Sequence, residues 1–164
     1  MTGKRPDADA SYFSPLRNGG MTDQSEIQAR LRITCQGDLW SIRSLLADAE
    51  VFLKEQSFPA DRIDDLKLVL AEAMTNIARH GYSDRPGEIS LSLVVEDRGV
   101  LCELVDTGVA FDPSGLGYSS PEPAQAREGG YGWFIIRAMS QSVCYVREQG
   151  RNKLCFRFPR GSAA

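Results

Sequence analysis

The sequence has only one histidine, His80, and its four cysteines are widely separated. A single histidine excludes a metal site built from several histidines, and without a paired nucleophile it gives little support for a catalytic triad. No Cys-x-x-Cys pair is present, which argues against a metal site or a disulfide framework. We therefore interpret the cysteines as small buried thiols of a protein in the reducing cytoplasm.

Long apolar runs and long basic runs are missing as well. No apolar stretch approaches the roughly 20 residues that a membrane-spanning helix requires, and the first residues do not form a secretory signal. The formal net charge is −3, and the 19 basic residues are spread along the chain without a run of five or six. The sequence therefore predicts neither a membrane partner nor direct nucleic-acid binding.

Two common phosphate-binding signatures are also absent. The chain has no Gly-x-x-x-x-Gly-Lys-Ser/Thr loop, so it is not a P-loop protein. It also lacks the glycine-rich loop followed by a catalytic His-Arg-Asp that eukaryotic-type protein kinases carry. Any nucleotide must therefore be held in another way.

The 164 residues, of which 42% are apolar, fit one folded domain with a packed core. Residues 1–25 are rich in Pro, Gly, Ser, Asp and Asn and show no sustained period, so we predict a flexible N-terminal tail. Residues 26–160 are predicted to form the domain.

Hydrophobic periodicity predicts the elements of this domain. The order is strand, two helices, strand hairpin, long loop, helix, strand hairpin, and Asp38 is the predicted N-cap of the first helix. Because the strands cluster, we expect an α+β two-layer sandwich with a mainly antiparallel mixed sheet and helices on one face, not a doubly wound parallel sheet. The predicted strands span 27–33, 89–95, 100–105, 142–147 and 154–158; the predicted helices span about 39–53, 60–80 (ended by Gly81) and 132–139; the loop spans 106–130.

Glu72 and Asn76 lie four residues apart on the second predicted helix, so their side chains project together. On a helical wheel they flank the apolar stripe, which places them at the edge of the core. A carboxylate and a carboxamide oxygen are hard ligands that suit Mg²⁺ together with phosphates and water. The alternative is an ordinary amphipathic helix with a polar boundary.

Asp106 follows an apolar strand and precedes Thr107 and Gly108. A carboxylate fixed at a strand end can accept a hydrogen bond from the exocyclic amine of adenine, and a glycine beside it permits close backbone approach. The alternative is an aspartate that only shapes a turn.

A glycine cluster, Gly129, Gly130 and Gly132 around Tyr131, runs directly into an apolar helix. Backbone amides at such a helix start point at anions, and the helix dipole adds partial positive charge. A flexible loop before a core helix is the alternative. The order of the three features within about 60 residues is improbable by accident, and together they predict a nucleotide site.

The three segments resemble the N, G1 and G2 boxes of the GHKL (Bergerat-fold) ATPase superfamily. The strings are LVLAEAMTNIARHGY at 68–82, VDTGVAFDP at 105–113 and GGYGWFIIRAM at 129–139. The resemblance is strongest to the compact bacterial anti-sigma-factor serine kinases and covers about residues 27–158.

The resemblance implies roles for individual residues. Glu72 is the expected general base, and Asn76 is the expected ligand of an Mg²⁺ ion that bridges the ATP phosphates. The remaining implied positions are Asp106, Thr107 and Gly108 at the adenine; Gly129, Gly130, Tyr131 and Gly132 at the phosphates; and Arg79, His80 and Asn152 at the mouth of the cleft.

The function implied is that of an anti-sigma factor and ATP-dependent protein serine kinase. Its expected partners are a sigma factor, a STAS-domain anti-anti-sigma protein and a second copy of the chain, paired through an edge strand at 27–33. Two departures from the family motivate an alternative, a non-catalytic module that only sequesters a partner. Ser140 stands where the family commonly has Asp, and Arg151-Asn152-Lys153 stands where it commonly has Gly-Thr, although Asn152 can supply a hydrogen-bonding group.

Overall fold

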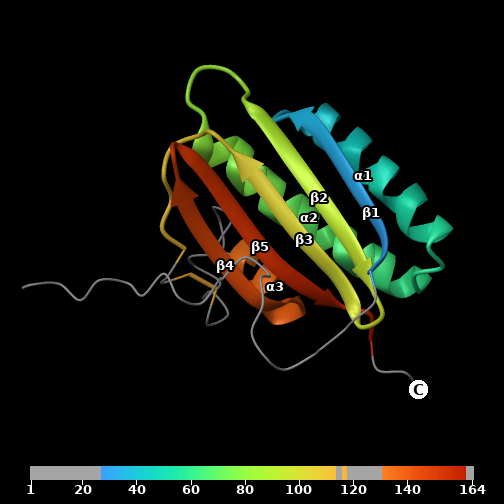
Figure 1. The fold of residues 1–164 in the computed structure, drawn as a ribbon. Coiled ribbons are helices and arrows are strands. Elements are labelled where there is room, and N and C mark those ends of the chain that lie inside the picture. The colour runs from blue at the N-terminus through green and yellow to red at the C-terminus, as the bar shows by residue number, and fades with distance from the viewer. Residues whose placement is uncertain (1–26, 114–115, 118–130, 162–164) are drawn as a thin grey trace, which may run out of the picture.

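The computed structural model describes residues 27–113, 116–117 and 131–161. Within these ranges the chain forms a five-stranded sheet and three helices (Figure 1). The elements are β1 (Ile27–Gln36), α1 (Leu39–Glu55), α2 (Ala60–Gly81), β2 (Glu88–Glu96), β3 (Gly99–Asp106), α3 (Tyr131–Met139), β4 (Gln141–Glu148) and β5 (Arg151–Pro159).

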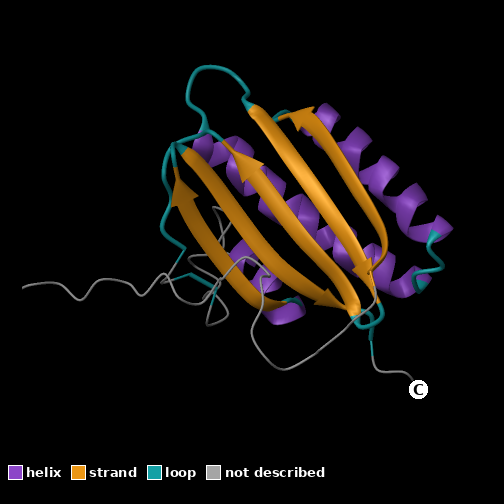
Figure 2. Cartoon of the chain, in the orientation of Figure 1, coloured by secondary structure: helices purple, strands orange, loops and turns teal. Residues whose placement is uncertain are grey.

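The strand order is β1-β2-β3-β5-β4, and each neighbouring pair of described strands is antiparallel. The helices lie together behind the sheet and cover one of its faces (Figure 2). This confirms the predicted α+β two-layer sandwich, because every strand turns back beside a neighbour and leaves the helices a single face to cover. No parallel pair occurs among these five strands, so the sheet is simpler than the predicted mixed one.

Local signals account for the two long helices. The Asp38 carboxylate accepts from the amide of Ser41 at 2.9 Å and from its hydroxyl at 2.7 Å, which confirms the predicted N-cap. These hydrogen bonds lower the pKa of Asp38. Gly81 is the last residue of α2 and Tyr82 is the C-cap, so Gly81 lies two positions before the C′ position that was predicted for it.

The core lies between the inward face of the sheet and the inner faces of α1 and α2. Alternate residues of the three central strands are buried, as the period of two requires. The largest fully buried side chains are Phe156, Phe158, Leu53, Ile63, Leu66, Leu70, Met74, Ile89, Leu91, Leu93, Leu104 and Ile136.

The last hairpin is longer than predicted, and this difference positions the site. Pairing with β3 continues two residues before the predicted start at Leu154, as far as Asn152, and Arg151 pairs with Glu148 of β4, so β5 begins at Arg151. The register sets Asn152 directly opposite Asp106. The sequence Arg-Asn-Lys carries no apolar signal that would predict a strand. In the structure Asn152 is nevertheless buried, while Arg151 and Lys153 are exposed.

Parts of the prediction lie outside the described residues, namely the N-terminal tail and most of the loop that ends in Gly129 and Gly130. Among the helices that the structure describes, none is both long enough and apolar enough to span a membrane.

Candidate nucleotide site

Helix α2 directs Glu72 and Asn76 toward the first turn of α3. A β-carbon placed on Gly132 would lie 2.8 Å from Glu72 Oε2 and 3.2 Å from Asn76 Nδ2. The start of α3 therefore lies directly against both polar groups, and a β-carbon at position 132 would displace the Glu72 carboxylate. The structure thus brings together the helical pair and one glycine of the cluster, which are 56 residues or more apart in sequence.

Asn76 carries an unsatisfied group at this contact. Its Nδ2 atom is buried and has no hydrogen-bond partner. A buried polar atom without a partner costs about 1–3 kcal/mol, so such groups often mark a place where a ligand binds. The donor set fits a nucleotide with its metal: the Asn76 amide offers an oxygen to a hard cation and an N–H to a phosphate oxygen.

Asp106 ends β3 and is only 5% exposed. Its Oδ1 atom accepts from the amide of Gly108 at 2.8 Å and from Asn152 Nδ2 at 2.9 Å. No residue in the described part of the chain donates to Oδ2. The carboxylate therefore keeps one oxygen for an external donor.

Hydrogen bonds to neighbouring elements hold the loop after Asp106 in place. The amide of Val109 donates to the Gly81 carbonyl at 2.8 Å. The amide of Thr107 donates to the Tyr82 hydroxyl at 3.0 Å. The amide of Phe111 donates to the Tyr145 hydroxyl at 3.0 Å. These contacts fix the backbone that surrounds the free carboxylate oxygen.

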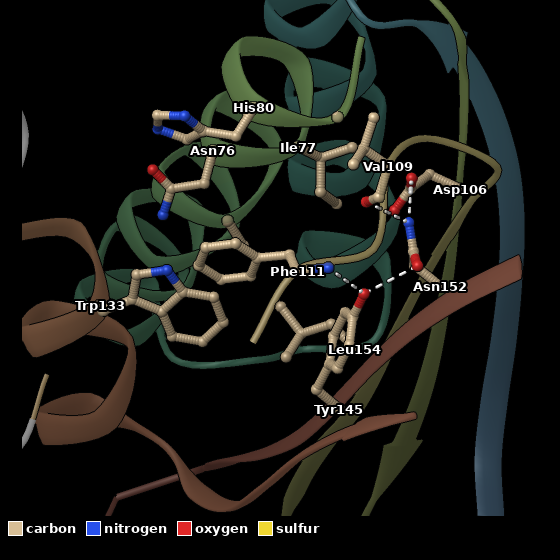
Figure 3. Close-up of a pocket in the computed structure, with 12 residues that line it drawn as sticks. Asn76, Ile77, His80, Asp106, Val109, Phe111, Trp133, Tyr145, Asn152 and Leu154 are labelled. Atoms are coloured by element: carbon tan, nitrogen blue, oxygen red, sulfur yellow. Dashed lines mark hydrogen bonds between the residues drawn. The ribbon is translucent and has the colours of Figure 1, made fainter. Parts of the chain in front are cut away.

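A cavity of about 40 Å³ opens beside Asp106 (Figure 3). It is several times the minimum needed for one water molecule, and its walls are mainly apolar. Phe111 stacks on Trp133 with ring centroids 5.5 Å apart and also meets Tyr145 edge to face. The lining residues are Ala73, Asn76, Ile77, His80, Gly81, Asp106, Val109, Phe111, Trp133, Tyr145, Asn152 and Leu154.

Several wall residues were not predicted from the sequence. Trp133 directly follows the glycine cluster, and helical periodicity predicts only that it belongs to an apolar helix. Tyr145 and Leu154 lie on the final hairpin, where strand periodicity alone does not distinguish a pocket wall from ordinary core. Phe111 lies inside the G1 string, five residues after Asp106, and its aromatic character is the one signal in the sequence that could have indicated a wall residue.

The other predicted residues differ in their placement. His80 lines the cavity and is exposed, as a mouth position requires, whereas exposed Arg79 is not among the lining residues. Asn152 lies deeper than the predicted mouth position and is only 3% exposed. Thr107 and Tyr131 are exposed at the edges of the site.

The described residues contain no group of three or more His, Cys, Asp or Glu side chains gathered as a metal site.

A comparison with protein families finds a match over most of the chain. The family model described as the histidine kinase-like ATPase domain covers residues 35–158. The chain belongs to this family. The match confirms the resemblance that the three boxes indicated, and it includes both Glu72 and Asp106.

Curated relatives of this ATPase-domain chain are serine-protein kinases named RsbW. The one from Oceanobacillus iheyensis is 33% identical over 100 residues, which are 57% of this chain and 63% of the relative. The one from Bacillus thuringiensis is 27% identical over 107 residues, or 62% and 67% of the two chains. The alignment thus spans less than two thirds of the first relative.

A solved structure shares the fold. It contains the RsbU and RsbW domains of a Mycobacterium tuberculosis protein and superposes with a TM-score of 0.58 at 17% identity. The match covers 80% of this chain and 32% of the other.

Proposed function

We propose that this protein is an ATP-dependent protein serine kinase that also acts as an anti-sigma factor in the cytoplasm. The observation that carries the proposal is the contact of Gly132 with Glu72 and Asn76, next to a cavity that is lined by Asp106, whose Oδ2 has no donor among the described residues. The kinases named RsbW among the relatives support the same reaction. The inferred substrate is a serine of a STAS-domain anti-anti-sigma protein.

The nucleotide base would occupy the apolar cavity. Asp106 Oδ2 would accept a hydrogen bond from the exocyclic amine of adenine, while Ile77 and Leu154 would contact the ring. This orientation carries the phosphates toward the start of α3. There the helix N-terminus and the Asn76 amide favour negative charge.

A magnesium ion would neutralise charge on the phosphates and orient the γ-phosphoryl group. Asn76 is the residue that would hold it, through Oδ1, while Nδ2 would donate to a phosphate oxygen and so gain the partner that it lacks.

Glu72 would orient the substrate serine and accept its proton. The serine oxygen forms a bond to the γ-phosphorus, the bond to the β-phosphate oxygen breaks, and ADP leaves. Because phosphoryl transfer depends mainly on positioning and charge stabilisation, this small set of residues is chemically sufficient. Gly132 contributes by leaving the Glu72 carboxylate room to face the reacting groups.

Transfer of label from γ-labelled ATP to serine on a purified STAS-domain antagonist tests the proposal. Glu72→Gln should abolish labelling while leaving Mg·ATP binding close to wild type. Asp64→Asn removes an exposed carboxylate on the same helix and serves as the matched control. Labelling by Glu72→Gln at the wild-type rate would show that Glu72 is not the base.

A second candidate is a binding module that keeps the fold and only sequesters a partner, as Ser140 and Asn152 suggest. The geometry favours the kinase, because Ser140 follows α3 at the end remote from Gly132, about 12 Å along the helix. Calorimetry separates the two. No binding at millimolar Mg·ATP would support the sequestering module.

We also propose a homodimer that forms through β1. This strand is an edge of the described sheet, is ten residues long and starts at Ile27, which is 48% exposed. Unpaired edges of this length readily add a second strand. Light scattering at tens of micromolar should give twice the chain mass, and a monomeric mass would contradict the proposal.

A further inference from the structure

Asn152 makes an unusually complete set of contacts for a residue in a strand. Its Nδ2 donates to Asp106 Oδ1 at 2.9 Å and to the carbonyls of Gly108 and Val109 at 3.2 Å each. Its Oδ1 accepts from the Tyr145 hydroxyl at 2.7 Å and from Arg147 Nη1 at 2.5 Å. The side chain is nearly fully buried, so these partners define its position.

These partners also fix the orientation of the Asn152 amide. Its nitrogen faces only acceptors, and its oxygen faces only donors. A reversed amide would set an oxygen against a carboxylate and two carbonyls, with no donor to satisfy any of them. Asn152 therefore presents an N–H to Asp106, which no aspartate or leucine at this position could do.

Arg147 and Tyr145 extend the same network to the loop after Asp106. Arg147 Nη1 also donates to the Gly108 carbonyl at 2.9 Å, and the Tyr145 hydroxyl also accepts from the amide of Phe111. The dashed lines in Figure 3 follow this chain from Asp106 through Asn152 to Phe111. The final hairpin thus holds both the carboxylate and its loop.

These contacts give the two carboxylate oxygens of Asp106 different roles. Oδ1 accepts two hydrogen bonds, one from its own loop and one from Asn152. A half-turn about the last side-chain bond exchanges two equivalent oxygens and restores the same contacts, whereas a smaller rotation would break both of them. The carboxylate is therefore held with Oδ2 as its remaining acceptor.

We propose that Asn152, fixed by Tyr145 and Arg147, is a positioning residue that gives the site its selectivity for 6-amino over 6-oxo purines. An acceptor-only oxygen favours a ligand that donates an exocyclic N–H and repels one that presents a carbonyl oxygen there. The inference rests on the proposed nucleotide function. It goes further by assigning the selectivity to a strand residue that acts through Asp106.

Calorimetric affinities for ATP and ITP, with Mg²⁺ present, test the inference. ITP carries a 6-oxo group in place of the amine and is otherwise the same molecule. Wild type should bind ATP tighter by about tenfold or more. Asn152→Leu removes the donor that Asp106 Oδ1 and the carbonyls of Gly108 and Val109 share, and it leaves the carboxylate held only by the amide of Gly108. The ATP/ITP ratio should therefore fall to about threefold or less. Asn152→Thr keeps a donor and should recover part of the ratio.

Leu53→Ala is the control that shows whether a loss of stability by itself changes the ATP/ITP ratio. Leu53 is fully buried near the end of α1 and does not line the cavity, so this variant should lower the melting temperature and keep the ratio. If Asn152→Leu does not fold, Asn152→Thr and Tyr145→Phe replace it. Each of these variants should show an ATP/ITP affinity ratio below that of wild type.

The outcomes separate the inference from the function on which it rests. An unchanged ratio in the folded Asn152 variants would reduce Asn152 to a structural role and overturn the inference. Wild type that binds ATP and ITP equally would overturn it as well, while the nucleotide function stands. Wild type that binds neither nucleotide would overturn both.

Discussion

Gly81 and Gly108 lie back to back, one at the end of α2 and the other in the loop after β3. A β-carbon on Gly108 would lie 2.5 Å from the Gly81 carbonyl oxygen and 2.8 Å from its Cα. The next residue, Val109, donates its amide to the same carbonyl at 2.8 Å. This backbone contact sets the distance between the helix that carries Glu72 and the strand end that carries Asp106.

The contact predicts that Gly108→Ala is destabilising. The added methyl would meet backbone atoms that cannot rotate away, so we expect a loss of about 1–3 kcal/mol in the free energy of unfolding. Gly81→Ala is the matched control, because its nearest contact is 3.7 Å and the position is helical. Urea denaturation measures both variants, and equal losses would contradict the argument from close approach.

Gly132→Ala should impair the reaction more than the fold. Its nearest contact is the Glu72 carboxylate, a side-chain end that can rotate away, so the free energy of unfolding should change by under about 1 kcal/mol. A displaced carboxylate should slow serine labelling by about 10²-fold. Ala138→Ser, an exposed change on the same helix, should leave labelling unchanged. If Gly132→Ala labels serine at the wild-type rate, the position of the Glu72 carboxylate does not control the reaction.

Glu50 should make the stability depend on acidic pH. Glu50 on α1 accepts hydrogen bonds from Lys54 of the same helix and from Lys67 of α2. These two contacts lower the pKa of Glu50 to about 2. A lowered pKa stabilises the fold above the unfolded-state value of about 4.3, and this contribution is lost as pH falls from there through about 2. The free energy of unfolding should therefore decline more steeply in wild type than in Glu50→Gln across that window. Parallel curves would show that the pair is broken in solution.

The cysteines should react slowly in the folded protein. Burial raises the pKa of Cys35 to about 11 and that of Cys155 to about 12, and it also raises the pKa of Cys102 and Cys144. Because the thiolate is the reactive form, alkylation of Cys35 at about pH 8 should be at least 10²-fold slower than in the unfolded chain. Mass spectrometry with iodoacetamide follows each site. Rapid labelling of Cys35 in the native protein would contradict this burial.

Nucleotide binding should change the fluorescence of Trp133. Of the two tryptophans, Trp133 lines the cavity and stacks on Phe111, whereas Trp40 is 81% exposed. In a Trp40→Phe background, added Mg·ATP should shift or quench the emission. In a Trp133→Phe background, the remaining Trp40 should not respond. A response from Trp40 alone would place the nucleotide elsewhere.

The sequence alone predicted the elements that bury a regular face. The alternation of Ile89, Leu91, Leu93 and Val95 and the helical stripe of α2 follow from periods of 2 and 3.6, which need no knowledge of neighbours. The Glu72–Asn76 pair was readable for the same reason, because helical spacing fixes its common direction. The bounds of β5 were not readable, since a buried Asn flanked by charged residues carries no apolar signal.

Local spacing thus determined the fold class, the direction of Glu72 and Asn76, and the place of Asp106 at a strand end. Only the tertiary structure decided that Gly132 packs against Glu72, that Asn152 pairs with Asp106 and that Phe111 stacks on Trp133. Sequence periodicity reports which way a side chain points on its own element. Strand register and helix packing decide which side chains of other elements that side chain contacts. The chemistry of the site depends on these contacts.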